Sequence, residues 1–190
     1  MNGLLEAALE IQEFLQKRRW RFAIIGGLAA IRWGEPRATQ DVDLALFTGF
    51  GEESTYVDET LARFQGRIPD AHRFALENRV LLIWASNRVA IDVSLAGIPY
   101  EEQLIRRASP FAFAPGASLV TCSAEDLVIL KAFAGRAQDW AAVEGVLIRQ
   151  RDRLDWAYID RHLPSLCDMK GEPEAVAQLT RLWERVREGP

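Results

Sequence analysis

Alternating hydrophobic and polar positions predict several short strands in the first 121 residues. Residues 41–47 (DVDLALF) and 88–96 (RVAIDVSLA) carry apolar side chains at every second position, a period that is typical of a strand with one buried face. Shorter apolar runs predict further strands at residues 22–25, 80–85 and 118–121. Ser86 and Asn87 separate two of these runs and predict a hairpin.

Helical spacing describes the N-terminus and the chain after residue 122. Apolar residues recur with this spacing from Leu4 to Leu15, with acidic residues between them, which predicts an amphipathic helix over residues 3–18. Ser123 is suited to begin a helical segment, because Asp126 three residues later completes a start that resembles a capping box. Further helices are expected at residues 27–33, 56–64, 99–107, 155–167 and 173–188.

The order of these elements predicts an α/β (α+β) fold. Helices and strands mix over residues 1–121, which are expected to form a core with a small mixed sheet and flanking helices. Residues 122–190 are expected to form a helical region packed on this core. With 190 residues, of which 49% are hydrophobic, the chain is long enough to bury a core.

Charge and cysteine content narrow the class of protein. The formal net charge is −4, so no bulk positive field indicates a nucleic-acid partner, and the basic clusters at residues 17–21 and 106–107 are interpreted as solvated. Cys122 and Cys167 have no CxxC spacing, which predicts neither a zinc site nor a disulfide framework. Without a signal-peptide pattern or a long apolar run, a cytoplasmic protein with no membrane partner is expected.

Asp41 and Asp43 are the first candidates for chemistry. An extended strand puts both on one face, about 7 Å apart at the backbone, in phase with Arg37 and Thr39. At ~4 Å, two such charges repel by about 4 kcal/mol at an effective dielectric near 20, so a cation is expected beside them. Paired carboxylates suit Mg²⁺, and the alternative is a polar edge strand that discourages association of sheets.

Asp92 is a third candidate. It lies on the polar face of the strand at residues 88–96, where it would complete a site for two metal ions and accept a proton from an attacking hydroxyl. Taken alone, Asp92 is a solvent-facing strand residue. Its significance therefore depends on its distance from Asp41 and Asp43.

Two further features suit a phosphate ligand. Gly26 and Gly27 stand between a strand and a helix, where backbone N–H groups accept phosphate, although a Gly-Gly pair is also common in an ordinary tight turn. Lys131 borders an apolar helix stripe, from which it either reaches inward to a triphosphate or extends outward into solvent. Arg136 and Asp139, three residues apart, predict an ion pair on a helix surface.

Taken together, these motifs resemble the nucleotidyltransferase superfamily typified by DNA polymerase beta. The resemblance covers residues 22–145 and is strongest over 26–44, where Gly-Gly precedes the pattern Arg-x-Thr-x-Asp-x-Asp-Leu. The later segment EDLVILKAFAGRAQDW resembles the abortive-infection branch, the AbiEii-like nucleotidyltransferase toxins and their bacterial relatives. Gln138 and Ala142 stand where this branch usually has a basic and an acidic residue.

The resemblance implies an enzyme that transfers NMP from an NTP to an acceptor hydroxyl and releases pyrophosphate. It implies two Mg²⁺ ions, or Mn²⁺ in their place, with the tRNA 3′ end, a protein or a small molecule as acceptor. Such an enzyme could be the toxin of a toxin–antitoxin pair, with an antitoxin protein as partner. The alternative to an enzyme is an inactive nucleotide-binding or partner-binding module that keeps the fold. The implied metal ligands and catalytic residues are Asp41, Asp43 and Asp92, and the implied nucleotide-binding residues are Gly26, Gly27 and Lys131. Arg37 and Thr39, which are in phase with the two acids, are second-line candidates for nucleotide binding through phosphate or orienting contacts.

Overall fold

A computed structural model describes residues 3–35 and 38–188, and their contacts divide into two compact units. The sheet unit comprises residues 3–28 and 38–122, and the helical unit comprises residues 29–35 and 123–188. Residues 29–35 thus group with the C-terminal helices. A division of the chain at residue 121 would place them with the sheet instead.

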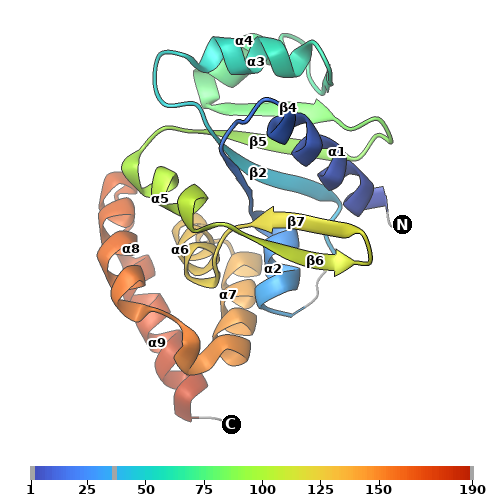
Figure 1. Cartoon of the computed structure of the whole chain (residues 1–190). Coiled ribbons are helices and arrows are strands. Elements are labelled where there is room, and N and C mark those ends of the chain that lie inside the picture. The colour runs from blue at the N-terminus through green and yellow to red at the C-terminus, as the bar shows by residue number, and fades with distance from the viewer. Residues whose placement is uncertain (1–2, 36–37, 189–190) are drawn as a thin grey trace. The chain divides into compact units, whose positions relative to one another are not determined.

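The sheet unit is built on one mixed β-sheet (Figure 1). In the described residues its order is β3-β4-β5-β2-β1-β7-β6. β2 is parallel to β5 and β1 is parallel to β7, whereas the other neighbouring pairs are antiparallel. The strands are β1 (Phe22–Ile24), β2 (Asp41–Phe47), β3 (Gln65–Gly66), β4 (Val80–Trp84), β5 (Ala90–Ala96), β6 (Ser109–Ala114) and β7 (Ala117–Thr121).

Four helices accompany this sheet: α1 (Gly3–Lys17), α3 (Glu53–Leu61), α4 (Ala71–Asn78) and α5 (Pro99–Arg107). α1 packs against β7 and β2, and α5 packs against β2 and β1. Gln12 of α1, itself buried, donates to the carbonyl of Ser118 and accepts from the N–H of Val120, so α1 is fixed to the β7 backbone by hydrogen bonds as well as by apolar contact. Ile11 and Leu15 of α1 are almost fully buried in this core.

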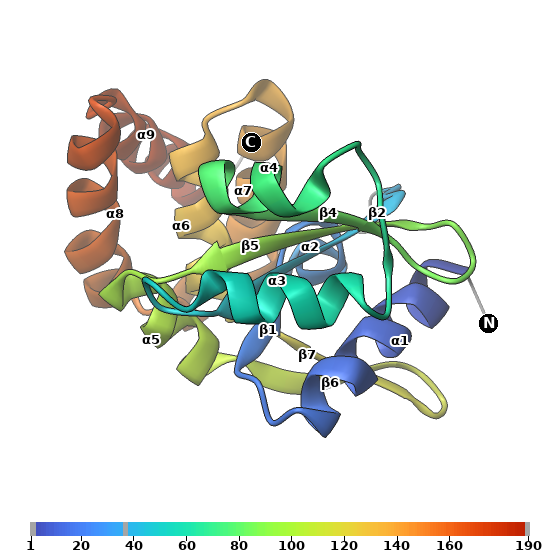
Figure 2. The same cartoon turned by 90° about the horizontal axis from the view of Figure 1, so that it is seen from above.

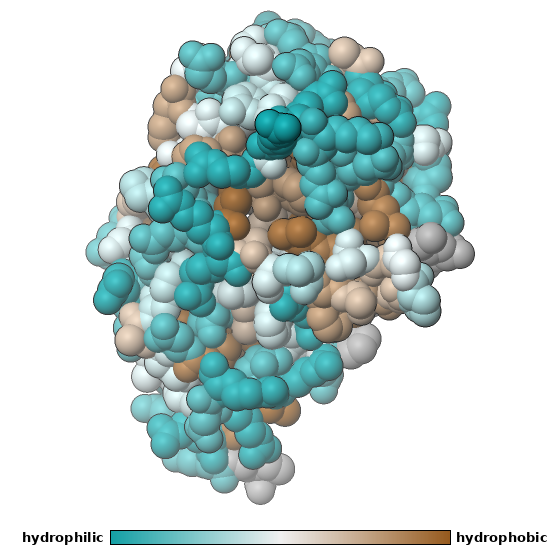
Figure 3. Space-filling model, in the orientation of Figure 1, coloured by the Kyte–Doolittle hydropathy of each residue, from teal (hydrophilic) through white to brown (hydrophobic). Residues whose placement is uncertain are grey.

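α3 and α4 contact each other, and α4 lies beside β4 (Figure 2). Each helix buries only two residues: Val57 and Thr60 in α3, and Ala71 and Ala75 in α4. Hydrophilic side chains accordingly predominate on the surface over these two helices (Figure 3). Their contribution to the core is therefore small.

Lys17, Arg18 and Arg21 of the basic cluster at the end of α1 form ion pairs within the sheet unit. Lys17 pairs with Glu13, and Arg18 pairs with Glu59. Arg21 pairs with Glu102, which also pairs with Arg106 of the second basic cluster. The interpretation of these clusters as solvated side chains is consistent with these exposed pairs.

The helical unit contains most of α2 (Gly26–Trp33), α6 (Ala124–Ala134), α7 (Ala137–Gln150), a 3₁₀ turn (Arg151–Arg153), α8 (Trp156–Lys170) and α9 (Glu174–Glu188). Ser123 caps α6 as predicted, because its Oγ accepts from the N–H of Asp126 at 3.1 Å. Tyr158 of α8 donates to Asp126 at 2.8 Å, which joins α8 to the start of α6. Gly135, with a φ of +72°, ends α6 and separates it from α7.

The predicted α/β fold class is confirmed. The hairpin of β4 and β5 is observed, and α5 has the predicted bounds of 99–107. The helix predicted at 56–64 instead covers 53–61, and α4, β3 and β6 were not predicted. These elements are short or little buried: α4 buries only two alanines, β3 has two residues, and β6 (SPFAFA) is an edge strand whose side chains are half-buried or exposed. Among the described residues, no helix has the length and apolarity to cross a membrane.

Candidate active site

Asp41 and Asp43 project from one face of β2, as the alternation predicts. Val42 and Leu44 are fully buried, whereas the two aspartates between and before them are partly exposed. The N–H of Ile25, at the end of β1, donates to the carbonyl of Asp43 at 2.9 Å and continues the pairing of β1 with β2. The strand therefore holds both carboxylates on the face opposite its apolar side chains.

Asp92 joins these two residues through the register of the sheet. β5 lies parallel to β2, and Asp92 is directly opposite Asp43 in that pairing. Residues opposite each other on neighbouring strands share a face. One carboxylate oxygen from each of Asp41, Asp43 and Asp92 lies within 4.8 Å of the others, in an arrangement that suits a metal ion.

The charge of Asp92 is only partly compensated by the protein. Burial raises the pKa of Asp92 above its ordinary value, the charge of Asp41 raises it further, and Arg67 acts against both. A guanidinium nitrogen of Arg67 lies 2.8 Å from Asp92 Oδ1. This contact is an ion pair without good hydrogen-bond geometry, so the buried Oδ1 of Asp92 has no hydrogen-bond donor among the described residues. A buried anionic oxygen without a donor, beside two more carboxylates, fits a divalent cation.

Gly26 and Gly27 are required by close approach of side chains to the backbone. Gly26 has a φ of +61°, and a Cβ atom there would lie 2.0 Å from Asp43 Oδ2. At Gly27, a Cβ atom would lie 2.3 Å from the hydroxyl oxygen of Thr39. Because any larger residue would displace these side chains, the glycine pair places the start of α2 directly against Asp43 and Thr39.

Thr39 lies beside the triad, but its observed contact is with protein. Its hydroxyl group donates to Asp41 Oδ1 at 3.2 Å and so orients that carboxylate. Arg37, the other residue expected in phase with the aspartates, lies outside the described residues. Contact of either residue with a nucleotide stays a prediction.

Lys131 belongs to α6 of the helical unit. Its ammonium group donates to Asp139 Oδ1 at 2.8 Å, and Arg136 donates to Asp139 Oδ2 at 2.6 Å. The predicted pair of Arg136 with Asp139 is confirmed, but its placement on the surface is wrong for Asp139, whose side chain is fully buried. Phosphate binding by Lys131 stays a prediction.

The pKa of Asp139 reflects these two contacts. Burial acts to raise it, but the hydrogen bonds from Arg136 and Lys131 outweigh burial and lower the pKa below its ordinary value. Since the folded state favours the ionised carboxylate, this cluster stabilises the protein above the ordinary pKa of aspartate. The stabilisation is lost as the pH falls through the lowered pKa of the folded state.

Replacing Lys131 by Ala is expected to lower the free energy of unfolding by about 1–2 kcal/mol, because the buried Asp139 loses one of its two cationic partners. Urea unfolding of both proteins measures the change. Lys17→Ala, which removes an exposed lysine from an i,i+4 pair, is the control and should change stability by less than ~0.5 kcal/mol. Unchanged stability in Lys131→Ala would contradict the structural role of this pair.

Sequence reasoning missed Arg67, the cation beside Asp92. The repulsion between neighbouring aspartates did predict a positive partner, but no motif marks an arginine in the segment GRIPD. Arg67 comes directly after β3, a two-residue strand without a detectable period. Only the pairing of β3 with β4, and of β4 with β5, brings it to Asp92.

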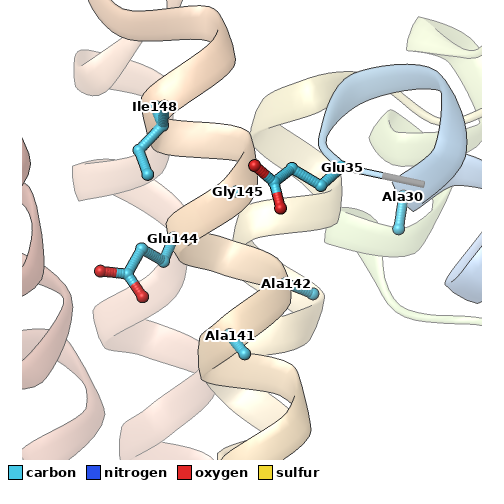
Figure 4. Close-up of a pocket in the computed structure, with 7 residues that line it drawn as sticks. All are labelled: Ala30, Glu35, Ala141, Ala142, Glu144, Gly145 and Ile148. Atoms are coloured by element: carbon cyan, nitrogen blue, oxygen red, sulfur yellow. The ribbon is translucent and has the colours of Figure 1, made fainter. Parts of the chain in front are cut away.

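The helical unit has a small cavity of its own. The cavity is lined by Ala30, Glu35 and residues of α7, among them Gly145. Figure 4 shows Glu35 reaching from the segment after α2 toward α7. Gly145 permits this approach, because a Cβ atom there would lie 3.3 Å from the backbone nitrogen of Glu35. None of the described residues lining this cavity is among those that the sequence predicts for catalysis.

Comparison with known proteins finds similarity at the level of structure. No family model matches the chain, and no curated protein matches it. An antigenic nucleotidyltransferase-like protein from Paracoccidioides brasiliensis has a TM-score of 0.53 and 15% identity, over 93% of this chain and 92% of its own. The lincosamide antibiotic adenylyltransferase LnuA, bound to lincomycin, has a TM-score of 0.51 and 9% identity, over 74% of this chain and 94% of its own. The antibiotic-resistance factor ANT(2'')-Ia has a TM-score of 0.52 and 16% identity, over 92% of this chain and 96% of its own.

These likenesses extend over most of the length of each similar chain. The class of fold is therefore that of the nucleotidyltransferase-like proteins, as the motifs at residues 26–44 predict. At 9–16% identity the similarity concerns the fold and not the substrate.

Proposed function

We propose that this chain is a metal-dependent nucleotidyltransferase that moves NMP from an NTP to an acceptor hydroxyl. The observation that carries the proposal is the triad of Asp41, Asp43 and Asp92, whose carboxylate oxygens lie within 4.8 Å of one another beside the start of α2. Such a triad at a helix N-terminus serves a reaction of metal-bound triphosphates. The similarity in fold to an adenylyltransferase supports the same reaction.

In this proposal Asp41, Asp43 and Asp92 hold two Mg²⁺ ions, with Mn²⁺ as a substitute. When bound, these ions neutralise the triphosphate and make the acceptor hydroxyl more acidic. Thr39 keeps Asp41 oriented through its hydrogen bond. Asp92 would take up the hydroxyl proton as the acceptor oxygen bonds to the α-phosphorus and pyrophosphate leaves.

The N–H groups of Gly26 and Gly27 are assigned to the β and γ phosphates, because they belong to the first turn of α2. Arg37, Thr39 and Lys131 are assigned to further phosphate or orienting contacts. For Thr39 and Lys131, binding of nucleotide competes with their observed bonds to Asp41 and Asp139. The assignment of Lys131 rests on the resemblance to the abortive-infection branch, and those of Arg37 and Thr39 rest on their phase with the two aspartates along the strand.

The acceptor is proposed as a tRNA 3′ end, a protein or a small molecule. Two of the similar structures are antibiotic-related, which favours including small hydroxylated compounds among the acceptors tested. The proposal includes a role as the toxin of a toxin–antitoxin pair, as in the abortive-infection branch. The decisive test incubates the protein and Mg²⁺ with each labelled NTP and RNA, lysate protein or small molecules. A labelled acceptor with released pyrophosphate supports transfer, and nucleotide binding without transfer supports the inactive binding module instead.

Mg²⁺ together with the NTP used by the protein is expected to raise the melting temperature, because both bind the folded state and the cation removes repulsion within the triad. A thermal shift assay at millimolar ligand measures the effect. Asp41→Asn and Asp43→Asn should each abolish the part of the shift that depends on metal. An unchanged melting curve of the unaltered protein with all four NTPs would count against the site.

A further inference from the structure

Arg67 occupies a defined place next to the triad. Its backbone N–H donates to the carbonyl of Leu82 in β4 at 2.9 Å, and Leu82 is opposite Asp92 in the pairing of β4 with β5. Asp92 is in turn opposite Asp43. Arg67, Leu82, Asp92 and Asp43 therefore form one row across the sheet, with the arginine at one end and the carboxylates at the other.

The side chain of Arg67 is directed along this row to Asp92. The two side chains are 20% and 30% exposed, and the guanidinium nitrogen lies 2.8 Å from Asp92 Oδ1. In the part of the chain that the structure describes, this is the single ion pair of Arg67, whose guanidinium also lies 5.8 Å from the centre of the Trp84 ring. Partial burial keeps this interaction from being fully screened by water.

The carboxylate of Asp92 that Arg67 contacts is also one of the three that a metal ion would use. A guanidinium and a divalent cation repel each other, so each lowers the affinity of a shared carboxylate for the other. We propose that Arg67 is a built-in counter-ion of Asp92 that competes with a divalent cation for this carboxylate. The inference rests on the proposed function, since the cation in question is the one that the triad is proposed to bind.

This competition has a measurable consequence. In the metal-free protein Arg67 holds Asp92 in the site despite the nearby charge of Asp41, which makes it a positioning residue. The same contact lowers the affinity of the triad for metal, because the ion pair must be broken or weakened before Asp92 becomes a ligand. Removing the guanidinium should therefore tighten metal binding, whereas loss of a purely structural residue would weaken it or leave it unchanged.

The test titrates Mn²⁺ without nucleotide, by calorimetry or by the electron paramagnetic resonance of free Mn²⁺. Arg67→Gln is expected to bind Mn²⁺ about tenfold more tightly than the unaltered protein, which corresponds to about 1.4 kcal/mol. Arg67→Lys, which keeps the charge, should stay near the original affinity. Arg73→Gln removes an equal charge from an exposed pair with Glu77 and should change affinity by less than about twofold.

A double variant separates the ion pair from general charge effects. In Arg67→Gln with Asp92→Asn, the gain in Mn²⁺ affinity should disappear, because position 92 no longer carries a carboxylate for which the arginine could compete. A second measurement needs no variant: saturating Mg²⁺ should shift the Nε–Hε resonance of Arg67 in nitrogen-15 NMR spectra and leave that of Arg73 unchanged.

The results also separate this inference from the proposed function. Tighter Mn²⁺ binding in Arg67→Gln without detectable transfer to any acceptor would support the counter-ion and count against the transferase. Transfer activity with unchanged or weaker Mn²⁺ binding in Arg67→Gln, and no shift of the Arg67 resonance, would overturn the counter-ion alone. Absence of metal binding in both proteins would overturn the inference and the metal site together.

Discussion

Replacing Asp92 by Asn is expected to lower the rate of nucleotidyl transfer by at least about 100-fold, the lower end of what a positioned acid–base group contributes. The amide has nearly the same shape but cannot take up the proton of the acceptor hydroxyl, and it is a poor ligand for a second cation. NTP affinity should stay within a few-fold, because Asp41 and Asp43 still hold a metal ion with its triphosphate. Single-turnover transfer and equilibrium NTP binding measure the two effects separately.

Asp58→Asn is the matched control for this variant. Asp58 lies in the same unit with a side chain that is 65% exposed and contacts His72, so its replacement should leave both measurements unchanged. Full transfer activity in Asp92→Asn would remove this residue from the catalytic assignment. A large loss of NTP affinity with normal transfer at saturation would instead make Asp92 a binding residue.

The second large effect is expected at Gly26. In Gly26→Ala, the added methyl group would occupy space that Asp43 Oδ2 now fills, at a separation of 2.0 Å, so the carboxylate must move. A displacement of about 1 Å at a reacting centre is enough to cost about 100-fold in rate. The left-handed backbone at Gly26 adds a strain of about 1–2 kcal/mol for a residue with a side chain. We therefore expect loss of transfer and weaker Mn²⁺ binding, together with a lower free energy of unfolding.

Gly49→Ala separates strain from displacement. Gly49 lies in the same unit with a φ of +69°, but a Cβ atom there would meet nothing within 4 Å. This variant should lose about 1–2 kcal/mol of stability and keep transfer and metal binding. If the two glycine variants behaved alike in transfer, the contact of Gly26 with Asp43 would have no catalytic role.

Local pattern was enough to predict the face on which the acids lie. Alternation along β2 predicted that Asp41 and Asp43 project together while Val42 and Leu44 are buried, and the structure confirms this. The capping of α6 by Ser123 was equally predictable. Both are properties of neighbouring residues, set by the period of the backbone and by the free N–H groups of a helix start.

The pairing of strands that are distant in the sequence could not be predicted from the alternation of apolar and polar residues. The alternation around Asp92 does not say which strand lies beside it, and the parallel register that sets Asp92 against Asp43 joins residues 49 positions apart in the chain. The burial of Asp139 could also not be predicted without the fold, since the spacing alone predicts only a helix-surface ion pair with Arg136. α4 was missed because it is short and buries only Ala71 and Ala75, and β6 was missed because it is an edge strand whose side chains are half-buried or exposed.

The sequence by itself determined the α/β class, the two aspartates on one strand face and the glycine pair before a helix. The tertiary structure decided that Asp92 completes the triad, that Arg67 neutralises it in part, and that Gly26 must lack a side chain because Asp43 fills that space. The physical reason is one of range. Side-chain direction follows from the backbone of a single strand, whereas the charge and space around a carboxylate depend on segments that meet only when the sheet assembles.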